Sequence, residues 1–406
     1  MYLRCSDESC HATLELHDRS LSCPRCGDLL EVVVTRNLPE PAELKRTWLQ
    51  RRTSHSPRDA SGVWRFRECL PDTYDEVITL CEGNTPLVQG QRTSVWADVR
   101  DLRFKHLGWS PTGCFKDLGM TVGMTEAKFV GAKSVGCAST GNTAASLAAY
   151  AARAGLAAKV FLPAGKVSRN KLAQSLDFGA EVVQVEGNFD FALETLLKHS
   201  HDELYFLNSV NPFRIEGQKT AMFEMLEQLE WHVPDYVVVP GGNLGNSSAF
   251  GKAFEELKNA GLIETAPRLV VVQAEGANPF ARLWHSGAND LLPEEHPETV
   301  ATAIRIGHPR SWKKALRAVH ETGGMVLDVT DEELSEAKGV IGRDGIGCEP
   351  ASATTLAAVR KLRHQGKLDR EATVVAILTG HALKDTDFIT RSQQQELEPA
   401  MAEVRS

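Results

Sequence analysis

Short apolar runs alternate with longer segments of helical composition over most of this 406-residue chain, and this alternation restricts the fold more than any other feature. Strands that alternate with helices form parallel sheets, because each parallel pair needs a crossover connection. In open sheets of this kind, ligands bind beyond the carboxyl ends of the strands. The sequence therefore predicts an α/β fold with its functional loops at those ends.

The expected strands are short and rich in valine, leucine and isoleucine. They cover residues 102–105, 134–138, 159–163, 181–185, 235–239, 269–272 and 373–378. Helices are expected over residues 116–130, 144–154 and 169–178, and Gly179 is expected to end the last of them. A turn at residues 82–87 is expected to start a further extended segment.

The composition excludes several classes of protein. A net charge of −8 argues against a protein that mainly grips nucleic acid or an anionic membrane surface. The chain has no run of eighteen apolar residues, and its first residues lack the basic and then apolar order of a signal peptide. We therefore expect a soluble cytoplasmic protein without nucleic-acid or membrane partners. In a reducing cytosol, paired cysteines indicate a metal site before a disulfide.

Two cysteine pairs near the N-terminus predict a small zinc ribbon. Cys5 and Cys10 form a loose first pair, and Cys23 and Cys26 form a tighter second one. Two thiolate pairs on tight turns can close a tetrahedral zinc site, and four protein ligands make such a zinc structural rather than catalytic. His11 is an alternative ligand to Cys10. Unmetallated thiols at a frayed terminus are the alternative to a metal site.

Lys116 lies just past a Pro/Gly turn, at the expected start of an apolar helix. The residue before a proline is disfavoured in helical geometry, and Gly113 permits a tight backbone. Lys116 would therefore enter a poorly solvated pocket at the first helical turn. Burial disfavours the ammonium form, and a neutral lysine can form a Schiff base with an aldehyde. The alternative is a solvated helix end, because Asp117 follows the lysine.

Two loops that follow strands are suited to anions. Residues 139–143 carry hydroxyl and amide side chains at the start of a helix, where free N–H groups and the helix dipole favour negative charge. Residues 240–246 are rich in glycine, and successive amides in such a loop form an anion-binding nest. This second loop lacks the Gly-Lys-Ser/Thr end of a nucleotide P-loop and the spacing of a dinucleotide fingerprint. It would therefore hold the phosphate of something other than ATP or NAD.

Two further loops add a guanidinium and a hydroxyl. Arg214 ends the polar stretch 208–214, and an arginine fork suits a phosphate or a carboxylate. A solvated arginine on a surface turn is the alternative. Thr379 follows the last expected strand. A reactive amine, a glycine nest, an anion-binding turn and a hydroxyl at a strand end together describe a pocket for pyridoxal phosphate.

From about residue 82 to residue 385 the chain resembles threonine synthases, within the tryptophan-synthase-β type (fold type II) of pyridoxal phosphate enzymes. The matching stretches are residues 82–87, 111–117, 139–143, 171–174 with 178–180, 208–220, 240–246 and 378–384. Many threonine synthases also resemble this chain at the ribbon. The resemblance implies two three-layer α/β domains with mostly parallel sheets, the cofactor in the cleft between them, and a small N-terminal ribbon.

The expected domain organisation follows from the cysteines, the composition and this resemblance. The parts are a zinc-ribbon-like segment (1–36), a linker or helical arm (37–72), a large cofactor-binding domain (73–120 and 215–390), a small substrate-side domain (121–214) and a C-terminal tail (391–406).

The resemblance implies a role for each loop. Lys116 would form the aldimine with the cofactor and move protons during the reaction. Asn142 would hydrogen-bond the 3′ oxygen of the cofactor, and Thr379 would face its ring nitrogen, where a neutral hydroxyl leaves the ring unprotonated more often than a carboxylate would. The residues implied at the cofactor phosphate are Gly241, Gly242, Asn243, Leu244, Gly245 and Asn246.

The reaction implied is conversion of O-phosphohomoserine and water to threonine and phosphate, by loss of the γ-phosphate and addition of water at the β carbon. The residues implied at the substrate carboxylate are Ser139, Thr140 and Asn142, and those implied at its phosphate are Ser209, Arg214, Lys105 and Asn243. The expected partner is thus a phosphorylated amino acid. The sequence does not reveal the oligomeric state, for which a homodimer is one option.

Four positions depart from the family pattern. Leu107, Ser110, Cys114 and Leu118 stand where the family usually carries Glu, Asn, Ser and Arg. They leave room for a related β-replacing enzyme such as cysteate synthase, which would use O-phosphoserine and sulfite. Cys114 would be a redox liability if exposed and inert if buried.

Two other functions remain as alternatives. A serine/threonine ammonia-lyase needs no phosphate site, so Arg214 argues against it. A non-catalytic zinc-ribbon binding protein on the same scaffold is the alternative from another class. The joint presence of Lys116, Asn142 and Thr379 argues against that alternative.

Overall fold

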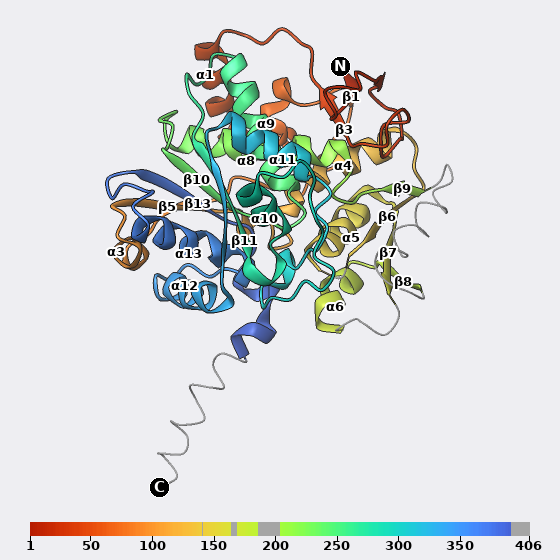
Figure 1. Ribbon diagram of the computed structural model, residues 1–406. Coiled ribbons are helices and arrows are strands. Elements are labelled where there is room, and N and C mark those ends of the chain that lie inside the picture. Colours follow the sequence, from red (N-terminus) through yellow and green to blue (C-terminus); the bar gives the residue numbers. More distant parts are fainter. Residues whose placement is uncertain (140, 164–168, 186–203, 391–406) are drawn as a thin grey trace.

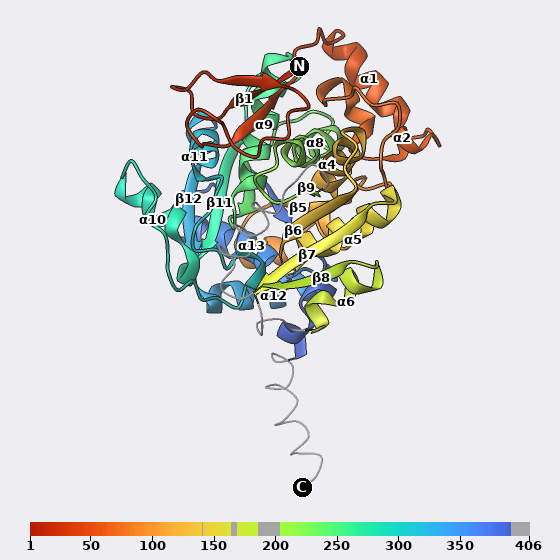
Figure 2. The same ribbon diagram turned by 90° about the vertical axis from the view of Figure 1, so that its right-hand side faces the viewer.

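The computed structural model describes residues 1–139, 141–163, 169–185 and 204–390. It contains two mostly parallel sheets and a small antiparallel ribbon that lies at one end of the molecule, near helices α4 (Lys116–Phe129) and α11 (Trp312–Glu321) (Figures 1 and 2). This arrangement confirms the predicted α/β class. Within these ranges, no helix combines the length and the apolar character that a membrane span needs.

The larger sheet has the strand order β12-β11-β10-β13-β5-β4 over the described residues. Its strands are β4 (Leu87–Gln89), β5 (Asp101–His106), β10 (Tyr236–Pro240), β11 (Arg268–Ala274), β12 (Met325–Val329) and β13 (Thr373–Leu378). Neighbours pair in parallel except β4, which runs antiparallel to β5. The edge strand β12 has no counterpart among the expected strands, because Asp328 interrupts its short apolar run.

Alternate residues of the central strands enter two separate cores, so the larger sheet is the middle of three layers. In β10, Val237 and Val239 belong to the core on one face, whereas Val238 belongs to the core on the other. The helices that contribute to the first core include α8 (Pro212–Gln228), α9 (Gly245–Asn259), α10 (Pro279–Ser286) and α11 (Trp312–Glu321). Those on the second face are α3 (Arg92–Ala97), α12 (Asp331–Arg343) and α13 (Pro350–His364).

The smaller sheet has the order β8-β7-β6-β9 over the described residues, and all its pairs are parallel. Its elements are β6 (Ser134–Ala138), α5 (Asn142–Ala154), β7 (Ala157–Pro163), α6 (Arg169–Asp177), β8 (Glu181–Val185) and β9 (Leu204–Phe206). Gly179 has a φ of +80°, which fits its predicted place after α6. Met120, Met124 and Ala127 of α4 (Lys116–Phe129) belong to the core of this sheet.

Helices α4 and α8 cross at close range and connect the two sheets. A Cβ on Gly217 would lie 1.8 Å from the carbonyl oxygen of Leu118, and a Cβ on Gly119 would lie 2.6 Å from that of Arg214. Only glycine allows backbones to approach so closely. Because α4 contributes Leu118 to the core of the larger sheet and Met120 to that of the smaller one, it holds both sheets at a fixed separation.

The segment 37–72 is a helical arm rather than a loose linker. It forms α1 (Pro41–Arg51), α2 (Pro57–Ala60) and the 3-10 helix η1 (Trp64–Cys69). Trp48 and Phe66 are fully buried, and their rings contact that of Phe223 in α8. The other 3-10 helices are η2 (Leu107–Trp109), η3 (Glu275–Ala277), η4 (Thr302–Ile304) and η5 (Ala382–Lys384).

The ribbon consists of β1 (Tyr2–Cys5), β2 (Thr13–Glu15) and β3 (Leu30–Val33) in the antiparallel order β2-β1-β3. On one side, a ring nitrogen of His17 lies 3.0 Å from a carboxylate oxygen of Glu126 at the end of α4. On the other side, Arg317 of α11 donates a 2.7 Å hydrogen bond to Glu31. The ribbon therefore contacts helices that belong to both sheets.

Candidate active site

The predicted cofactor lysine sits on a loop that is joined to a second predicted loop. Gly113 has a φ of +82°, and α4 begins at Lys116. The amide of Phe115 donates to the carbonyl of Thr379 at 2.9 Å, and the amide of His381 donates to the carbonyl of Gly113, also at 2.9 Å. The lysine loop and the Thr379 loop are thus paired through their backbones.

Asp117 braces the lysine loop from inside. It is fully buried and accepts hydrogen bonds from the backbone N–H and the hydroxyl of Thr112, each at 2.7 Å, and from the hydroxyl of Ser146 at 2.6 Å. Burial raises the pKa of the Asp117 carboxyl to about 6. The alternative of a solvated Lys-Asp helix end is therefore wrong, because the aspartate faces the interior.

Lys116 itself is held in an environment that disfavours its charge. Its ammonium nitrogen lies 4.0 Å from the centre of the Phe115 ring. Burial, together with the positive charge of Arg214, lowers the pKa of the Lys116 amine to about 8. A substantial fraction of the amine is therefore neutral near physiological pH, as a nucleophile toward an aldehyde requires.

The lowered pKa predicts how capture of the cofactor depends on pH. The rate of Schiff-base formation between the apoprotein and pyridoxal phosphate should rise about tenfold per pH unit below pH 8 and level off above it, because only the neutral amine attacks. Stopped-flow absorbance measures this rate. A rate that continues to rise tenfold per unit up to pH 10 would indicate a lysine with an ordinary pKa.

Two predicted cofactor residues, Asn142 and Thr379, both hydrogen-bond the carboxylate of Glu349, which is not among the residues predicted for the site. The Nδ2 atom of Asn142 donates to Oε2 of Glu349 at 2.9 Å, and the hydroxyl of Thr379 donates to Oε1 at 3.0 Å. Glu349 is buried just before α13, and its own amide donates to the carbonyl of Gly380 at 3.0 Å. The only sequence signal for it is a glutamate before the proline that begins a helix.

Gly380 makes room for this carboxylate. A Cβ at that position would lie 2.4 Å from Cδ of Glu349, closer than any side chain tolerates. The glycine of the Thr379 loop is therefore required by the carboxyl group packed beneath it.

The glycine-rich loop lies between β10 and α9, as predicted. A Cβ on Gly241 would lie 2.8 Å from Val271, and Leu244 adopts a φ of +63° directly before the helix. The N–H groups of Gly245 and Asn246 at the start of α9 have no acceptor among the described residues, so they can bind an anion, whereas the N–H of Ser247 donates to the side chain of Asn246 at 2.9 Å. Asn246 is tied back to the carbonyl of Pro240 at 3.1 Å.

The structure brings together some of the predicted substrate residues. The Nδ2 atom of Asn243 donates to the hydroxyl of Ser209 at 3.0 Å. Arg214 is buried in the first turn of α8, and its Nε atom has no hydrogen-bond partner among the described residues. Ser139 lies at the end of β6 beside Gly141, whereas Thr140 falls outside the residues that the structure describes.

Lys105 is not brought to this group. Its ammonium donates to the carboxylate of Glu224, to the carbonyl of Thr85 at 2.7 Å and to the side chain of Gln228 at 2.8 Å. An ammonium group has three donors, and all three are occupied inside the protein. Lys105 is therefore part of a buried ion pair and has no donor left for a substrate phosphate.

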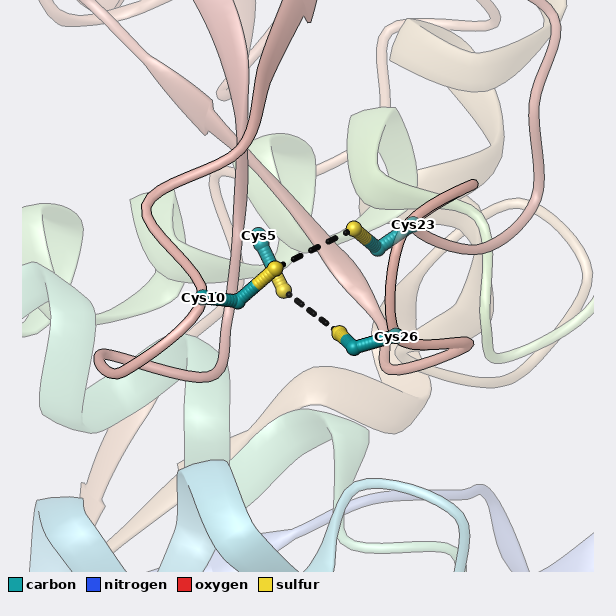
Figure 3. A group of neighbouring side chains, drawn as sticks. All are labelled: Cys5, Cys10, Cys23 and Cys26. Atoms are coloured by element: carbon teal, nitrogen blue, oxygen red, sulfur yellow. Dashed lines mark hydrogen bonds between the residues drawn. The ribbon is translucent and has the colours of Figure 1, made fainter.

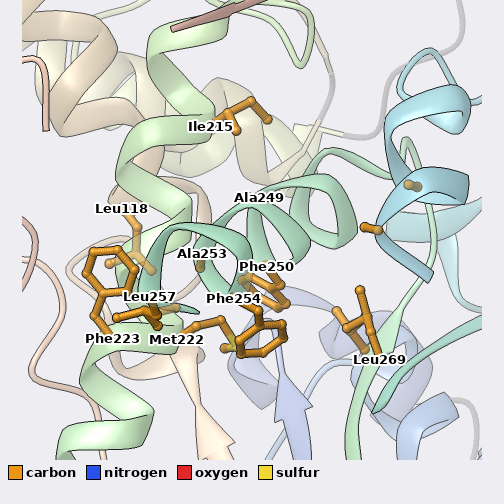
Figure 4. Packing of buried hydrophobic residues seen from close by; sticks show 14 of the residues in the cluster. Leu118, Ile215, Met222, Phe223, Ala249, Phe250, Ala253, Phe254, Leu257 and Leu269 are labelled. Carbon is orange, nitrogen blue, oxygen red and sulfur yellow. The ribbon is translucent and has the colours of Figure 1, made fainter. Parts of the chain in front are cut away.

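Two of the four departures from the family pattern belong to the hydrophobic core. Leu107 and Leu118 are buried in the cluster around α8, to which Met222 and Phe223 also belong (Figure 4). Cys114 is buried, with its sulfur 3.8 Å from the carbonyl of Asn142, and burial raises its pKa to about 11, so it is inert as a thiolate. Leu107 and Leu118 therefore pack in the core and present no charge to a ligand, whereas the family resemblance implies Glu and Arg at these two positions.

Lys384 connects the lysine loop with the smaller sheet. Its ammonium donates to the carbonyl of Thr112 at 3.1 Å and to Oε1 of Gln174 in α6 at 2.6 Å. Gln174 also donates to that carbonyl, at 3.2 Å. The loop that carries Lys116 is thus held by side chains from both parts of the fold.

The four predicted metal ligands converge in the ribbon. The sulfur atoms of Cys5, Cys10, Cys23 and Cys26 all lie within 4.8 Å of one another, and the two closest contacts are 3.4 Å and 3.7 Å (Figure 3). Tetrahedral zinc with bonds of about 2.3 Å places its sulfur ligands about 3.8 Å apart. The alternative ligand His11 is not a member of this group.

The arrangement fits pyridoxal phosphate on several observations. A lysine amine of lowered pKa can take the aldehyde, and a glycine loop at a helix N-terminus can take the phosphate. The Nε atom of Arg214 has no hydrogen-bond partner among the described residues, and the guanidinium donates only to the carbonyl of Leu207 there, so its positive charge is available to a second anion. The group as a whole is suited to a phosphorylated substrate beside a cofactor aldehyde.

Comparison with known families gives a match over most of the chain. The family described as pyridoxal-phosphate dependent enzymes matches residues 78–380. The threonine synthase of Methanocaldococcus jannaschii is 44% identical over 391 residues, which cover 96% of this chain and 94% of that protein. The threonine synthase of Methanosarcina acetivorans is also 44% identical, over 96% of this chain and 93% of that protein.

Solved structures agree on the fold. A maize serine racemase superposes with a TM-score of 0.63 at 21% identity, over 79% of this chain and 94% of that one. An L-serine ammonia-lyase from the fungus Rhizomucor miehei superposes with a TM-score of 0.64 at 18% identity, over 75% of this chain and 95% of that one.

Proposed function

We propose, from the premise that this chain belongs to the pyridoxal-phosphate dependent enzyme family, that it is a threonine synthase. It converts O-phosphohomoserine and water to threonine and phosphate. The observation that carries this assignment is the similarity to threonine synthases over almost the whole chain. The similarity agrees with the resemblance that the sequence motifs predict.

Pyridoxal phosphate supplies, when bound, an aldehyde for an amine and a ring that withdraws electrons from the α carbon of the substrate. We propose that Lys116 holds the aldehyde carbon, Asn142 the 3′ oxygen, Gly241–Asn246 the phosphate, and Thr379 the ring nitrogen. The positions of these residues on the ends of parallel strands and the first turns of helices support this proposal.

The chain's own residues would then bind and protonate the substrate. The amine of Lys116 is suited to remove the proton from the α carbon and to return protons to the substrate, because its lowered pKa lies close to working pH. Arg214, Ser209 and Asn243 would hold the phosphate of the substrate, with Ser139 and Thr140 at its carboxylate. Loss of a second proton, from the β carbon, supplies the electron pair that breaks the Cγ–O bond, and phosphate leaves with the bonding electrons. Water then adds its hydroxyl group to the β carbon, and protons return to the γ carbon, to the α carbon and to the released phosphate.

A direct experiment tests the function. Purified protein should bind pyridoxal phosphate with a visible absorbance band that borohydride bleaches, and it should release phosphate from O-phosphohomoserine with formation of threonine. O-phosphoserine with sulfite is the comparison substrate, since it would be used by a cysteate synthase. A colourless protein, or one active only with the comparison pair, would reject the assignment.

We further propose that the cysteine cluster binds a structural zinc. Its four thiols and their spacing in Figure 3 support this, and a structural zinc bound with about 10 kcal/mol or more would hold the ribbon folded. Removal of the metal with a strong chelator should make residues 1–36 the first target of limited proteolysis, while the cofactor absorbance is retained. Unchanged protease resistance in protein shown to be free of metal would contradict this role.

The remaining expectations are proposals of the same kind. We propose that the ribbon-like segment 1–36, the large domain 73–120 with 215–390 and the small domain 121–214 are the units of the fold, with the cofactor between the last two. The chain's free thiols support a cytoplasmic location. Sedimentation analysis would show whether the protein is a homodimer, the option that the sequence leaves open.

A further inference from the structure

The carboxyl group of Glu349 lies at the centre of a small hydrogen-bonded group in which every proton can be assigned. Its oxygens accept from Asn142 and Thr379, as described above, and Ser352 in the first turn of α13 lies on the other side of Thr379. Glu349, Ser352 and Thr379 are all buried, so water does not compete for their protons.

Ser352 has one possible role in this group. Its hydroxyl oxygen accepts from the amide of Thr379 at 2.8 Å and from the amide of Gly380 at 3.2 Å. A hydroxyl has two lone pairs and one proton, so the oxygen of Ser352 is filled as an acceptor. Its proton is left to donate, and the hydroxyl oxygen of Thr379 lies 3.0 Å away.

The hydroxyl of Thr379 then has two alternative states. When Glu349 is ionised, Thr379 donates its proton to the carboxylate, accepts from Ser352, and has one lone pair left, which can bind only a donor. When Glu349 is protonated, Thr379 accepts from both neighbours and its own proton is free, so it can bind only an acceptor. The protonation of Glu349 therefore decides what Thr379 can bind.

We propose that Glu349 and the ring nitrogen of bound pyridoxal phosphate share a single proton through the hydroxyl of Thr379. This inference rests on the proposed function, in which Thr379 faces that nitrogen. As the O–H bond of Glu349 breaks, its proton passes to the oxygen of Thr379. The original Thr379 proton passes to the ring nitrogen at the same time, and the carboxylate keeps the electron pair. No proton is gained from or lost to solvent.

The surroundings of Glu349 suit such a sharing. Burial raises the pKa of its carboxyl, which favours the protonated state. The side chains of Asn142 on α5 and Thr379 after β13, and the charges of Lys384 in η5 and Lys116 in α4, act in the opposite direction and stabilise the carboxylate. Burial thus favours protonated Glu349, and the polar and charged neighbours favour ionised Glu349. Because these effects oppose each other, a change in the charge of the ring during the reaction can move the proton.

The consequence for the reaction is that the ability of the cofactor ring to accept electrons changes with the protonation of its nitrogen. A neutral hydroxyl alone would leave the ring nitrogen unprotonated and the ring a weak acceptor of electrons. A buried acid one hydroxyl away can protonate the nitrogen when electrons flow into the ring and take the proton back afterwards. Glu349 acts through Thr379 and is therefore a positioning residue in this scheme.

The test measures the ring nitrogen directly in the holoenzyme. Protein is loaded with ¹⁵N-labelled pyridoxal phosphate, and the nitrogen chemical shift is compared with those of protonated and unprotonated reference compounds. In the wild type we expect a value displaced toward the protonated reference. Glu349→Gln keeps the shape and still donates to Thr379 but has no transferable proton. It should move the resonance to the unprotonated position and lower kcat about 10²-fold.

Two further variants complete the test. Thr379→Val removes the relay and should also give the unprotonated resonance, whereas Glu371→Gln, an exposed glutamate near the opposite end of β13, should leave the wild-type value unchanged. Circular dichroism and thermal melting confirm that each variant is folded.

The inference and the proposed function fail in different ways. A wild-type resonance at the unprotonated position, or a Glu349→Gln resonance equal to that of an active wild type, would overturn the sharing of the proton and leave the enzyme assignment intact. A wild type that neither binds the cofactor nor releases phosphate would overturn the assignment and the inference with it.

Discussion

Replacement of Lys116 by alanine should lower kcat for O-phosphohomoserine by at least about 10⁴-fold, the upper range for a positioned acid–base group. The variant loses the amine that captures the cofactor and the group that moves protons at the α carbon. Its fold should be retained, because the half-buried Lys116 forms no ion pair with another described residue and Asp117 still braces the loop. Phosphate release and the borohydride-sensitive absorbance band measure the two losses separately.

Lys128 offers a matched control on the same helix. It is exposed near the other end of α4, so Lys128→Ala should keep both the absorbance band and full activity. A positioned acid–base group contributes at least about 100-fold to kcat. If Lys116→Ala kept more than about 1% of kcat, another residue would therefore have to carry the proton transfers.

Replacement of Lys105 by methionine should destabilise the protein by about 3–5 kcal/mol, because it leaves the buried carboxylate of Glu224 without its charged partner. The KM for O-phosphohomoserine of the remaining folded enzyme should stay close to that of the wild type, since the three donors of Lys105 are used inside the protein. Denaturant unfolding and steady-state kinetics on the same preparation measure the two effects.

An exposed ion pair serves as the control for the loss of stability expected in Lys105→Met. Lys313 pairs with Asp28 at 2.7 Å but is half exposed, so Lys313→Met should cost no more than about 1 kcal/mol. A Lys105→Met variant of normal stability whose KM is raised tenfold or more would instead support the role at the substrate phosphate that the family resemblance implies.

Lys105 and Glu349 illustrate what the sequence can and cannot predict about the site. The sequence predicts four of the loops, because each follows an apolar run; they are the loops of Lys116, of Asn142, of the glycine stretch and of Thr379. Their joint presence indicates a pocket for pyridoxal phosphate. The use of Lys105 depends on Glu224, more than one hundred residues away in α8, and no local pattern reveals that pairing. Glu349 is likewise positioned by hydrogen-bond partners from two distant segments, Asn142 at the start of α5 and Thr379 with Gly380 after β13.

The fold could be predicted where local pattern and final environment agree. The strands β6 and β13 follow continuous apolar runs that are buried on both faces, and both were expected over the residues where they occur. The arm over residues 37–72 has a polar, Arg-rich composition, yet Trp48 and Phe66 bury it against α8. A few large aromatic side chains outweigh the average composition of such a segment.

The contacts of the ribbon have a consequence for the order of events during synthesis. The ribbon is synthesised before the helices that it contacts, because Glu126 follows Cys26 by about 100 residues and Arg317 follows it by about 290 residues. At about 5–20 residues per second, the second docking surface is therefore missing for about 15–60 s after the last cysteine has been made. Until Arg317 has been made, the nascent ribbon lacks its contact with α11, and the proposed zinc would help to keep it folded. Zinc supply in the cell should therefore affect the yield of folded enzyme more than its activity once folded.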